Sequence, residues 1–319
     1  MSPQSILVTG GAGFIGSNLV EFLLKETDVN VFVLDSFTYA GRKENIARHL
    51  DNRRFRILQG DITDRNTVAC VLNRYPYPFD GILNLAAESH VDRSINDAST
   101  FLRTNVEGTL VLLDEARKAG VTRFLQVSTD EVYGSLAAEE DPFTEEHHLE
   151  PNSPYSASKA SADLLVRAFH ETYGMDTVTT RCSNNYGPRQ HPEKLIPMVI
   201  QRARNGERIP VYGDGKNIRD WIYVEDHCRG IWDAFTKGQS GEVYNFGGDC
   251  EKTNLYVVRI ILHIVGKEDD LLEFVKDRPG HDRRYAVDFS KARRILGWSP
   301  RVQFEEGIQE TVNWYLNHK

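Results

Sequence analysis

Short apolar segments alternate with amphipathic ones from residue 4 to about residue 182, and no other feature constrains the fold as strongly. The apolar segments are typical of buried strands, and the amphipathic ones, such as Asn18–Lys25 and Asn105–Lys118, of covering helices. Strands separated by helices form βαβ crossovers and pair in parallel. The expected strands are Ile6–Val8, Val31–Leu34, Phe55–Leu58, Ile82–Leu85, Phe124–Val127 and Thr177–Arg181.

The pattern changes after Gly187-Pro188, where short strands such as Ile209–Tyr212 mix with helices and glycine-rich turns. We therefore expect an α/β fold with two parts. Residues 1–187 are predicted to form a Rossmann-type, doubly wound parallel sheet that binds a dinucleotide and carries the catalytic residues. Residues 188–319 are predicted to form a smaller C-terminal α/β lobe that binds substrate. The boundary is approximate because the chain can cross back.

A glycine-rich segment follows the first expected strand and opens a helix, which is the context a dinucleotide fingerprint requires. Its glycines permit a tight turn, a close approach to a pyrophosphate and close helix–strand packing. A glycine motif alone can also be only a tight turn. The residues assigned to the cofactor from this segment are Gly10, Gly13, Phe14, Ile15 and Gly16.

Asp35 closes the second expected strand, about 20 residues beyond the glycine loop. A carboxylate there accepts hydrogen bonds from the adenosine ribose and repels a 2′-phosphate, which favours NAD over NADP. Arg42 and Lys43 leave this preference open, because a basic pair can attract that phosphate. Asp61 and Ile62 follow the third expected strand and are candidates for an adenine contact.

Tyr155 and Lys159 lie one turn apart on an expected helix, with Ser153 as its N-cap and Pro154 at its first position. A phenol has a pKa near 10, roughly three units too high for a base at neutral pH. A nearby ammonium and a cationic nicotinamide would lower that pKa. The same spacing also occurs on solvated helix faces, and the glycine loop and Ser128-Thr129 favour the catalytic interpretation.

Asp130 and Glu131 are adjacent carboxylates that follow the buried segment Phe124–Ser128. They are expected at the carboxyl end of a parallel strand, where doubly wound sheets bind their ligands. Such a pair can also be a solvated loop or a helix cap. In a closed pocket the two acids titrate together, which leaves one protonated and one ionised. One acid and one base are what an elimination needs.

Charge and composition exclude several classes of function. The formal net charge of −8 gives no basic footprint for nucleic acid. No run of 18 apolar residues occurs, so no spanning helix or membrane partner is expected. The first residues lead directly into a strand without a basic leader, which predicts a cytoplasmic protein.

Cysteine and histidine spacing gives no metal pattern. The cysteines are far apart and are expected to be structural thiols. We predict no metal site. The residues concerned are Cys70, Cys182, Cys228, Cys250, His90, His191 and His281.

The chain resembles extended short-chain dehydrogenases/reductases, and within that group the dTDP-glucose 4,6-dehydratases of deoxysugar biosynthesis. The glycine loop and the Tyr155/Lys159 pair identify only the wider group. The segment Ser128–Gly134, with its paired acids, distinguishes dehydratases from related sugar epimerases. The resemblance extends over nearly the whole chain through the segments Thr9–Gly16, Ala86–Ser94, Ser128–Gly134, Tyr155–Lys159, Arg181–Pro188 and Asp277–Tyr285.

This resemblance implies roles for the catalytic residues. Tyr155 takes the proton of the sugar 4-hydroxyl, Thr129 hydrogen-bonds that hydroxyl and Lys159 binds the nicotinamide ribose. Glu131 removes the C5 proton and later returns one, while Asp130 protonates the departing C6 hydroxyl. NAD is regenerated, and the product is the 4-keto-6-deoxy nucleotide sugar.

The resemblance also implies binding residues and assembly. Ala86, Ala87, Thr104 and Asn185 match cofactor contacts. Helices around 105–118 and 155–173 would pair across a two-fold axis into a four-helix homodimer contact. The residues that match nucleotide-sugar contacts are Ser89, Thr129, Asn184, Lys194, Leu195, Pro210, Tyr212, Arg219, Asn254, Arg278 and His281.

Two further functions remain open from the sequence. A related UDP-hexose 4,6-dehydratase or 4-epimerase shares most motifs, and the acid pair argues against the epimerase. A non-catalytic dinucleotide-sensing protein keeps the fold but usually loses the tyrosine or lysine, and both are present here. Thymine or uracil specificity and the downstream pathway do not follow from spacing.

Overall fold

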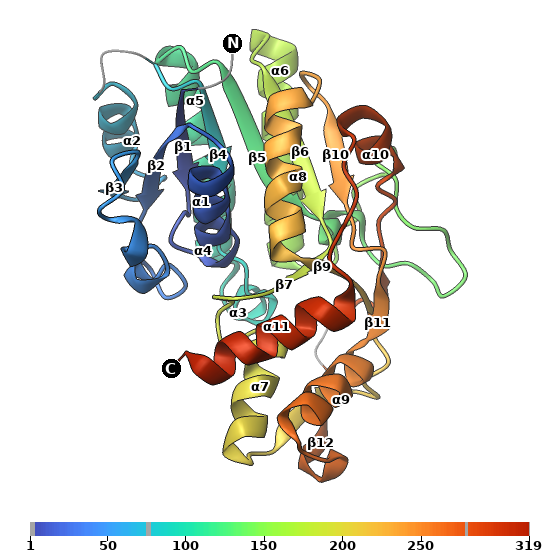
Figure 1. Ribbon diagram of the computed structural model, residues 1–319. Helices are drawn as coiled ribbons and strands as arrows, with labels where there is room; N and C mark the ends of the chain where they lie inside the picture. Colours follow the sequence, from blue (N-terminus) through green and yellow to red (C-terminus); the bar gives the residue numbers. More distant parts are fainter. Residues whose placement is uncertain (1–3, 75–77, 278–279, 319) are drawn as a thin grey trace.

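The computed structural model describes residues 4–74, 78–277 and 280–318. Its main element is a seven-stranded, fully parallel sheet in the order β10-β6-β5-β4-β1-β2-β3. This order confirms the doubly wound sheet (Figure 1). The strands are β1 (Ser5–Thr9), β2 (Asn30–Asp35), β3 (Phe55–Gln59), β4 (Gly81–Asn84), β5 (Arg123–Thr129), β6 (Thr177–Cys182) and β10 (Val243–Phe246).

Helices cover both faces of this sheet because successive strand side chains point to opposite sides. Ile6 and Val8 pack with α1 (Phe14–Glu26) and α8 (Val224–Lys237) in one buried cluster. Leu7, between them, packs with the other face. That second face is covered by α2 (Arg65–Leu72), α5 (Gly108–Lys118) and α6 (Pro154–Tyr173).

The smaller lobe lies below the carboxyl ends of the strands (Figure 1). One of its sheets joins β11 (Glu251–Thr253), β9 (Ile218–Tyr223) and β13 (Arg284–Tyr285), with β7 (Asn184–Tyr186) beside β9. A second pairs β12 (Leu272–Val275) with β8 (Ile209–Tyr212). The covering helices α7 (Leu195–Asn205), α9 (Asn254–Val265) and α11 (Phe304–Asn317) share one apolar cluster.

The chain crosses between the two parts after residue 187. Helix α8 and strand β10 return to the large sheet, where Val243 pairs with Thr179 of β6. Helix α10 (Ser290–Leu296) and Trp298 also pack in the α1/α8 cluster. The large sheet is therefore not built from residues 1–187 alone.

The predicted helix start at Ser153 is confirmed. Ser153 caps α6 by accepting from the Ser156 backbone N–H, and the Ser156 hydroxyl oxygen accepts from the Ser153 backbone N–H, which completes a capping box. The predicted helix Asn105–Lys118 is regular only from Gly108, because a wider π-helical turn spans Leu102–Glu107. The short helices α3 (Val91–Asn96) and α4 (Ala98–Phe101) precede that turn.

Over the described ranges, none of the helices has the length and apolar character needed to cross a bilayer. Within the same ranges, no group of three His, Cys, Asp or Glu side chains gathers as metal ligands would. The four cysteines are free thiols, as expected.

Candidate active site

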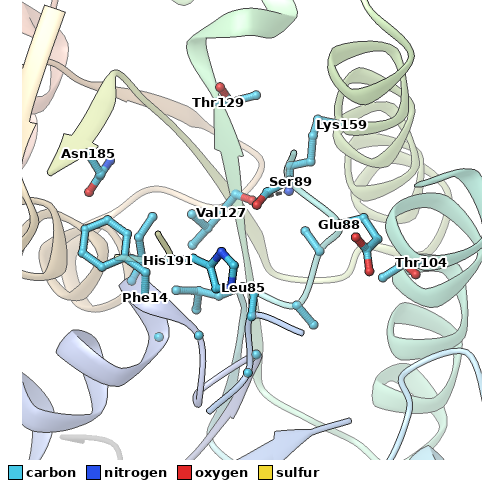
Figure 2. Close-up of a pocket in the computed structure, with 18 of the residues that line it drawn as sticks. Phe14, Leu85, Glu88, Ser89, Thr104, Val127, Thr129, Lys159, Asn185 and His191 are labelled. Carbon is cyan, nitrogen blue, oxygen red and sulfur yellow. Dashed lines mark hydrogen bonds between the residues drawn. The ribbon is translucent and has the colours of Figure 1, made fainter. Parts of the chain in front are cut away.

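One pocket extends along the carboxyl ends of the strands and gathers residues from six of them. Thr129 and Asp130 stand at the end of β5, and Cys182 to Asn185 follow β6. Gly10, Asp35, Asp61 and Ala86 stand at the ends of β1 to β4. Figure 2 shows this convergence, with Phe14 and Asn185 on one side and Glu88, Thr104 and Lys159 on the other. This is the ligand position of an open parallel sheet.

The glycine loop packs so tightly that neither Gly10 nor Gly16 could carry a side chain. Gly10 has φ +67°, and a Cβ there would lie 2.7 Å from the backbone nitrogen of Ala86. A Cβ on Gly16 would lie 2.1 Å from the carbonyl oxygen of Gly10. At these glycines the loop therefore presents backbone without side chains, which suits a pyrophosphate, and Phe14 and Ile15 of α1 line the pocket beside it.

Asp35 stands at the end of β2 and is held by the glycine loop. Its carboxylate accepts hydrogen bonds from the backbone N–H groups of Ala12 (2.9 Å) and Phe37 (2.8 Å). Burial raises the pKa of Asp35, and these two hydrogen bonds oppose the shift. Asp35 lines the pocket, whereas Arg42 and Lys43 are not among the described residues that line it. Lys43 instead lies over the Phe37 ring.

Every residue assigned to the cofactor from the sequence lines this pocket. The glycine backbone, a carboxylate at the end of β2 and polar groups at the ends of β4 to β6 fit a dinucleotide. The assigned residues are Gly10, Gly13, Phe14, Ile15, Gly16, Asp35, Asp61, Ile62, Ala86, Ala87, Thr104, Tyr155, Lys159 and Asn185.

Tyr155 and Lys159 both line the pocket from the first turns of α6, and both are buried. The Nζ atom of Lys159 donates to the carbonyl oxygen of Val127 at 2.7 Å (Figure 2). The expected lowering of the tyrosine pKa by Lys159 is not seen. Burial, then the charge of Glu131, raise the pKa of Tyr155, and a hydrogen bond with Thr129 opposes them. The protein groups alone therefore keep this phenol protonated.

The acid pair occupies a single 3-10 turn, η4 (Asp130–Tyr133), directly after β5. Asp130 is 1% exposed, and Glu131 is half-buried. Burial and then the Glu131 carboxylate raise the pKa of Asp130 well above its usual value. The Oδ2 atom of Asp130 has no hydrogen-bond partner within the described ranges. The sequence predicted that one carboxyl of the pair is protonated and the other ionised. The environment of Asp130 favours the protonated form.

The residues matched to nucleotide-sugar contacts divide into two groups. Ser89, Thr129, Asn184 and Lys194 line the pocket. Lys194 also joins its two sides, since its Nζ donates to the carbonyl oxygen of Ser89 at 2.7 Å. Arg278 lies outside the described residues. Away from the described pocket lining, in the smaller lobe, lie Leu195, Pro210, Tyr212, Arg219, Asn254 and His281.

Arg219 connects the second group to the acid pair. Its guanidinium donates to the carbonyl oxygen of Asp282 at 3.0 Å and lies 4.4 Å from the centre of the Tyr285 ring. Its positive charge partly offsets the rise in the Asp130 pKa, and burial, then the charge of Glu131, raise the pKa of Tyr285. Tyr212 and His281 meet edge-to-face with ring centres 6.5 Å apart.

The sequence did not identify a polar cluster at the pocket, which joins residues that follow β2 and β4 to His191 and Glu193. Arg93 lies 3.7 Å from the centre of the Tyr39 ring and 3.2 Å from a Glu193 oxygen. His191 meets the same ring edge-to-face, and Glu88 lines the pocket with its pKa raised by burial. Glu88 lies inside the segment Ala86–Ser94 that carried the resemblance, and only its position there could have indicated it.

Comparisons with known proteins agree with this geometry. A model of the family described as GDP-mannose 4,6 dehydratase matches residues 7–311. The chain is 53% identical to a low-salt glycan biosynthesis protein of Haloferax volcanii, over 98% of this chain and 99% of that protein. It is 50% identical to a dTDP-glucose 4,6-dehydratase of Neisseria gonorrhoeae, over 99% and 96% of the two chains.

The chain is also similar to a solved structure. The dTDP-glucose 4,6-dehydratase of Streptomyces venezuelae, crystallised with NAD and dTDP bound, superposes with a TM-score of 0.95. It is 48% identical and covers 99% of this chain, while this chain covers 98% of it.

Proposed function

Because this chain belongs to the GDP-mannose 4,6 dehydratase family and is one of its dTDP-glucose 4,6-dehydratases, we propose how its own side chains divide the reaction. The enzyme is an NAD-dependent hydro-lyase that converts dTDP-glucose to dTDP-4-keto-6-deoxyglucose in deoxysugar biosynthesis. One observation carries the proposed division: the adjacent acids Asp130 and Glu131 stand at the end of β5 in the same pocket as Tyr155 and Lys159.

The cofactor is held by backbone and by one carboxylate. The glycine loop seats the pyrophosphate, Asp35 accepts from the adenosine ribose and Asp61-Ile62 contact the adenine. Lys159 binds the nicotinamide ribose. When bound, NAD accepts the hydride from C4 of the sugar and returns it to C6.

Tyr155 removes the proton of the sugar 4-hydroxyl, assisted by a hydrogen bond from Thr129. The protein groups hold the phenol protonated. The Lys159 ammonium, one turn away on α6, and a bound cationic nicotinamide would both favour the phenolate, so that Tyr155 could accept the proton of the 4-hydroxyl once the cofactor is in place.

Glu131 and Asp130 carry out the elimination. The C4 ketone acidifies the C5 hydrogen, and Glu131 takes that proton. The C6–oxygen bond breaks as Asp130 delivers a proton to the hydroxyl, which leaves as water. Burial supports the assignment of Asp130 as the acid, because it raises the pKa of this carboxyl. Glu131 returns a proton to C5 when C6 is reduced.

The two groups of substrate residues match the two ends of a nucleotide sugar. Ser89, Thr129, Asn184 and Lys194 are proposed to bind the sugar end, since they line the pocket with the acids. Arg219 is proposed to bind the diphosphate, because the N–H donors of a planar guanidinium match the geometry of phosphate oxygens. The rest of the smaller lobe is proposed to bind the nucleobase. We thus assign the large sheet, with α8 and β10, to the cofactor and the other segments after residue 187 to the substrate.

Product analysis tests the proposed function. The purified protein is incubated separately with dTDP-glucose and with UDP-glucose, and the nucleotide sugars are identified by mass and proton NMR. We expect a 4-keto-6-deoxy product, formed faster from dTDP-glucose. Preferential turnover of UDP-glucose would indicate the related UDP-hexose dehydratase, and a C4 epimer would indicate an epimerase. If neither substrate loses water, the assignment is contradicted.

We also propose a cytoplasmic homodimer. Helices α5 and α6 lie side by side and expose Leu110 (38%) and Leu164 (58%). Pairing these helices with a second copy would bury both side chains in a four-helix contact. Sedimentation of the wild type and of Leu164→Lys tests this: a dimer that Leu164→Lys converts to monomer supports the contact, and an unchanged dimer excludes it.

A further inference from the structure

A buried arginine lies between the two segments that carry the catalytic side chains. Arg181 is on β6, where it pairs in register with Ser128 of β5. Its Nε donates to Oδ2 of Asp163 at 3.0 Å, and its Nη1 donates to the hydroxyl of Tyr133 at 2.9 Å. The exposed fractions of the Arg181 and Asp163 side chains are 7% and 2%. This ion pair is thus deeply buried, and neither residue is among the described residues that line the pocket.

Each partner of Arg181 belongs to a different catalytic segment. Asp163 lies on α6, one turn after Lys159 and two turns after Tyr155. Tyr133 closes the 3-10 turn that begins with Asp130 and Glu131. The arginine therefore connects the helix that carries the oxidation residues to the turn that carries the elimination residues.

Asp163 balances more than one cation. It is the first charge that opposes the lowering of the Lys159 pKa by burial, so it stabilises the Lys159 ammonium as well as Arg181. Two buried cations next to one carboxylate leave little freedom for any of the three groups, because an uncompensated buried charge is strongly unfavourable.

The ring of Tyr133 is fixed independently of its contact with Arg181. It stacks on Phe143 with ring centres 5.0 Å apart and planes at 22°. Its hydroxyl donates to Oδ1 of Asn245 at 2.8 Å. Removal of the hydroxyl would thus delete the hydrogen bonds to Arg181 and Asn245, while the ring keeps its stacking on Phe143 and its place 4.8 Å from the Arg181 guanidinium.

We propose that Arg181, Asp163 and Tyr133 form a positioning unit that sets the distance between Glu131 and Asp130 on one side and Tyr155 and Lys159 on the other. None of the three touches the reacting atoms. They act through the acid pair, and the inference rests on the elimination role proposed for that pair. The unit keeps the 3-10 turn aligned with the sugar after oxidation, when the C5 proton must reach Glu131.

The test is Tyr133→Phe, with Tyr244→Phe as its matched control. Tyr244 is also fully buried, and its hydroxyl accepts from the Gln239 backbone at 2.9 Å without contacting Arg181. We expect Tyr133→Phe to lower kcat about tenfold or more, because a displacement near 1 Å can cost on the order of 10²-fold. KM should change little. Reduced cofactor should accumulate at its absorbance band, and the control should behave as wild type in both readouts.

A double-mutant cycle with Glu131→Gln separates positioning from general destabilisation. If Tyr133 acts through the acid pair, Tyr133→Phe should slow the reaction far less in the Glu131→Gln background than in the wild type. Equal effects in both backgrounds would overturn the inference. Arg181→Lys provides a second variant, since a lysine keeps the charge for Asp163 but has no planar fork for Tyr133.

The outcomes distinguish this inference from the proposed function. If Glu131→Gln alone causes reduced cofactor to accumulate, while Tyr133→Phe and Arg181→Lys match Tyr244→Phe, the positioning unit is wrong and the acid pair stands. If Glu131→Gln does not stall the reaction, the roles of the acids themselves are wrong. Thermal unfolding of each variant shows that the comparison is made on folded protein.

Discussion

The cofactor side and the substrate side of the pocket are built in different ways. The cofactor side consists of strand ends and the glycine loop, and all of its assigned residues line the pocket. The substrate side combines a few pocket-lining residues with side chains such as Arg219 and Tyr212 from the smaller lobe. The first side is specified locally, whereas the second depends on how the two parts of the chain pack together.

This difference predicts how each side responds to substitution. A change in the glycine loop affects backbone that cannot move, since a Cβ at Gly16 meets the Gly10 carbonyl. A change in the smaller lobe affects one of several side chains that are proposed to bind the substrate together. A substitution in the glycine loop should therefore abolish cofactor binding. A substitution in the smaller lobe should weaken substrate binding only in part.

The largest expected effect is on the cofactor side. Gly16→Leu should abolish NAD binding, because the side chain would occupy the space between the loop and the helix that seats the pyrophosphate. Calorimetric titration with NAD measures this, with circular dichroism to show that the variant is folded. Gly206→Leu is the control: its φ of +68° makes this substitution strained too, but a Cβ there meets nothing within 4 Å and Gly206 is not among the described residues that line the pocket, so NAD binding should persist. Wild-type affinity in a folded Gly16→Leu variant would refute the cofactor assignment.

Tyr155→Phe tests a residue that is assigned both to the cofactor site and to the reaction at C4 of the sugar. It should slow C4 oxidation by roughly 10²–10⁴-fold, the usual range for loss of a general base. Substrate binding should persist, because the ring keeps its buried position beside Phe101. Single-turnover absorbance of reduced cofactor is the measurement. Oxidation at the wild-type rate in the variant would remove Tyr155 from this role.

A moderate effect is expected on the substrate side. Arg219→Lys should raise KM for dTDP-glucose by about 10- to 100-fold, since a charged hydrogen bond is worth about 1.5–3 kcal/mol. The value of kcat should fall much less. Arg283→Lys is the control, because this neighbouring arginine is exposed and paired with Asp214. If both variants raise KM equally, the diphosphate does not bind at Arg219.

The smallest expected effect concerns cofactor choice. The wild type should bind NAD more tightly than NADP, because Asp35 repels a 2′-phosphate. Asp35→Asn should reduce this preference about tenfold, as expected when a like-charge repulsion is removed. Arg42→Ala should leave it unchanged, since Arg42 is not among the described pocket-lining residues. A preference that follows Arg42 and not Asp35 would contradict the account.

The residues that the sequence assigned to the cofactor come together in one pocket, because the signals that identify them are local. The glycine loop, Asp35 and the Ser153 cap each depend on a few neighbouring residues, and the structure has them as expected. Strand β10 was not predicted, because its place depends on pairing with β6 some 60 residues earlier in the chain. The Arg181–Asp163 pair likewise joins two elements whose contact no local pattern encodes.

The pKa of Tyr155 shows a second limit of sequence-based inference. Spacing placed Lys159 one turn from the phenol and predicted a lower pKa. In the structure the ammonium turns to the Val127 carbonyl, and burial next to Glu131 raises that pKa instead. Periodicity gives the face on which a side chain lies, whereas its hydrogen-bond partner depends on the neighbouring strand.

The central claim is that Asp130 and Glu131 act after C4 oxidation. The most direct test measures reduced cofactor and solvent deuterium at C5 in Glu131→Gln and Asp130→Asn, with exposed Glu139→Gln as the control. Turnover should fall by roughly 10²–10⁴-fold in both variants. Reduced cofactor and the 4-keto intermediate should accumulate, and deuterium entry should drop most in Glu131→Gln. Oxidation and elimination lost in equal measure, or wild-type product formation in both variants, would contradict the account.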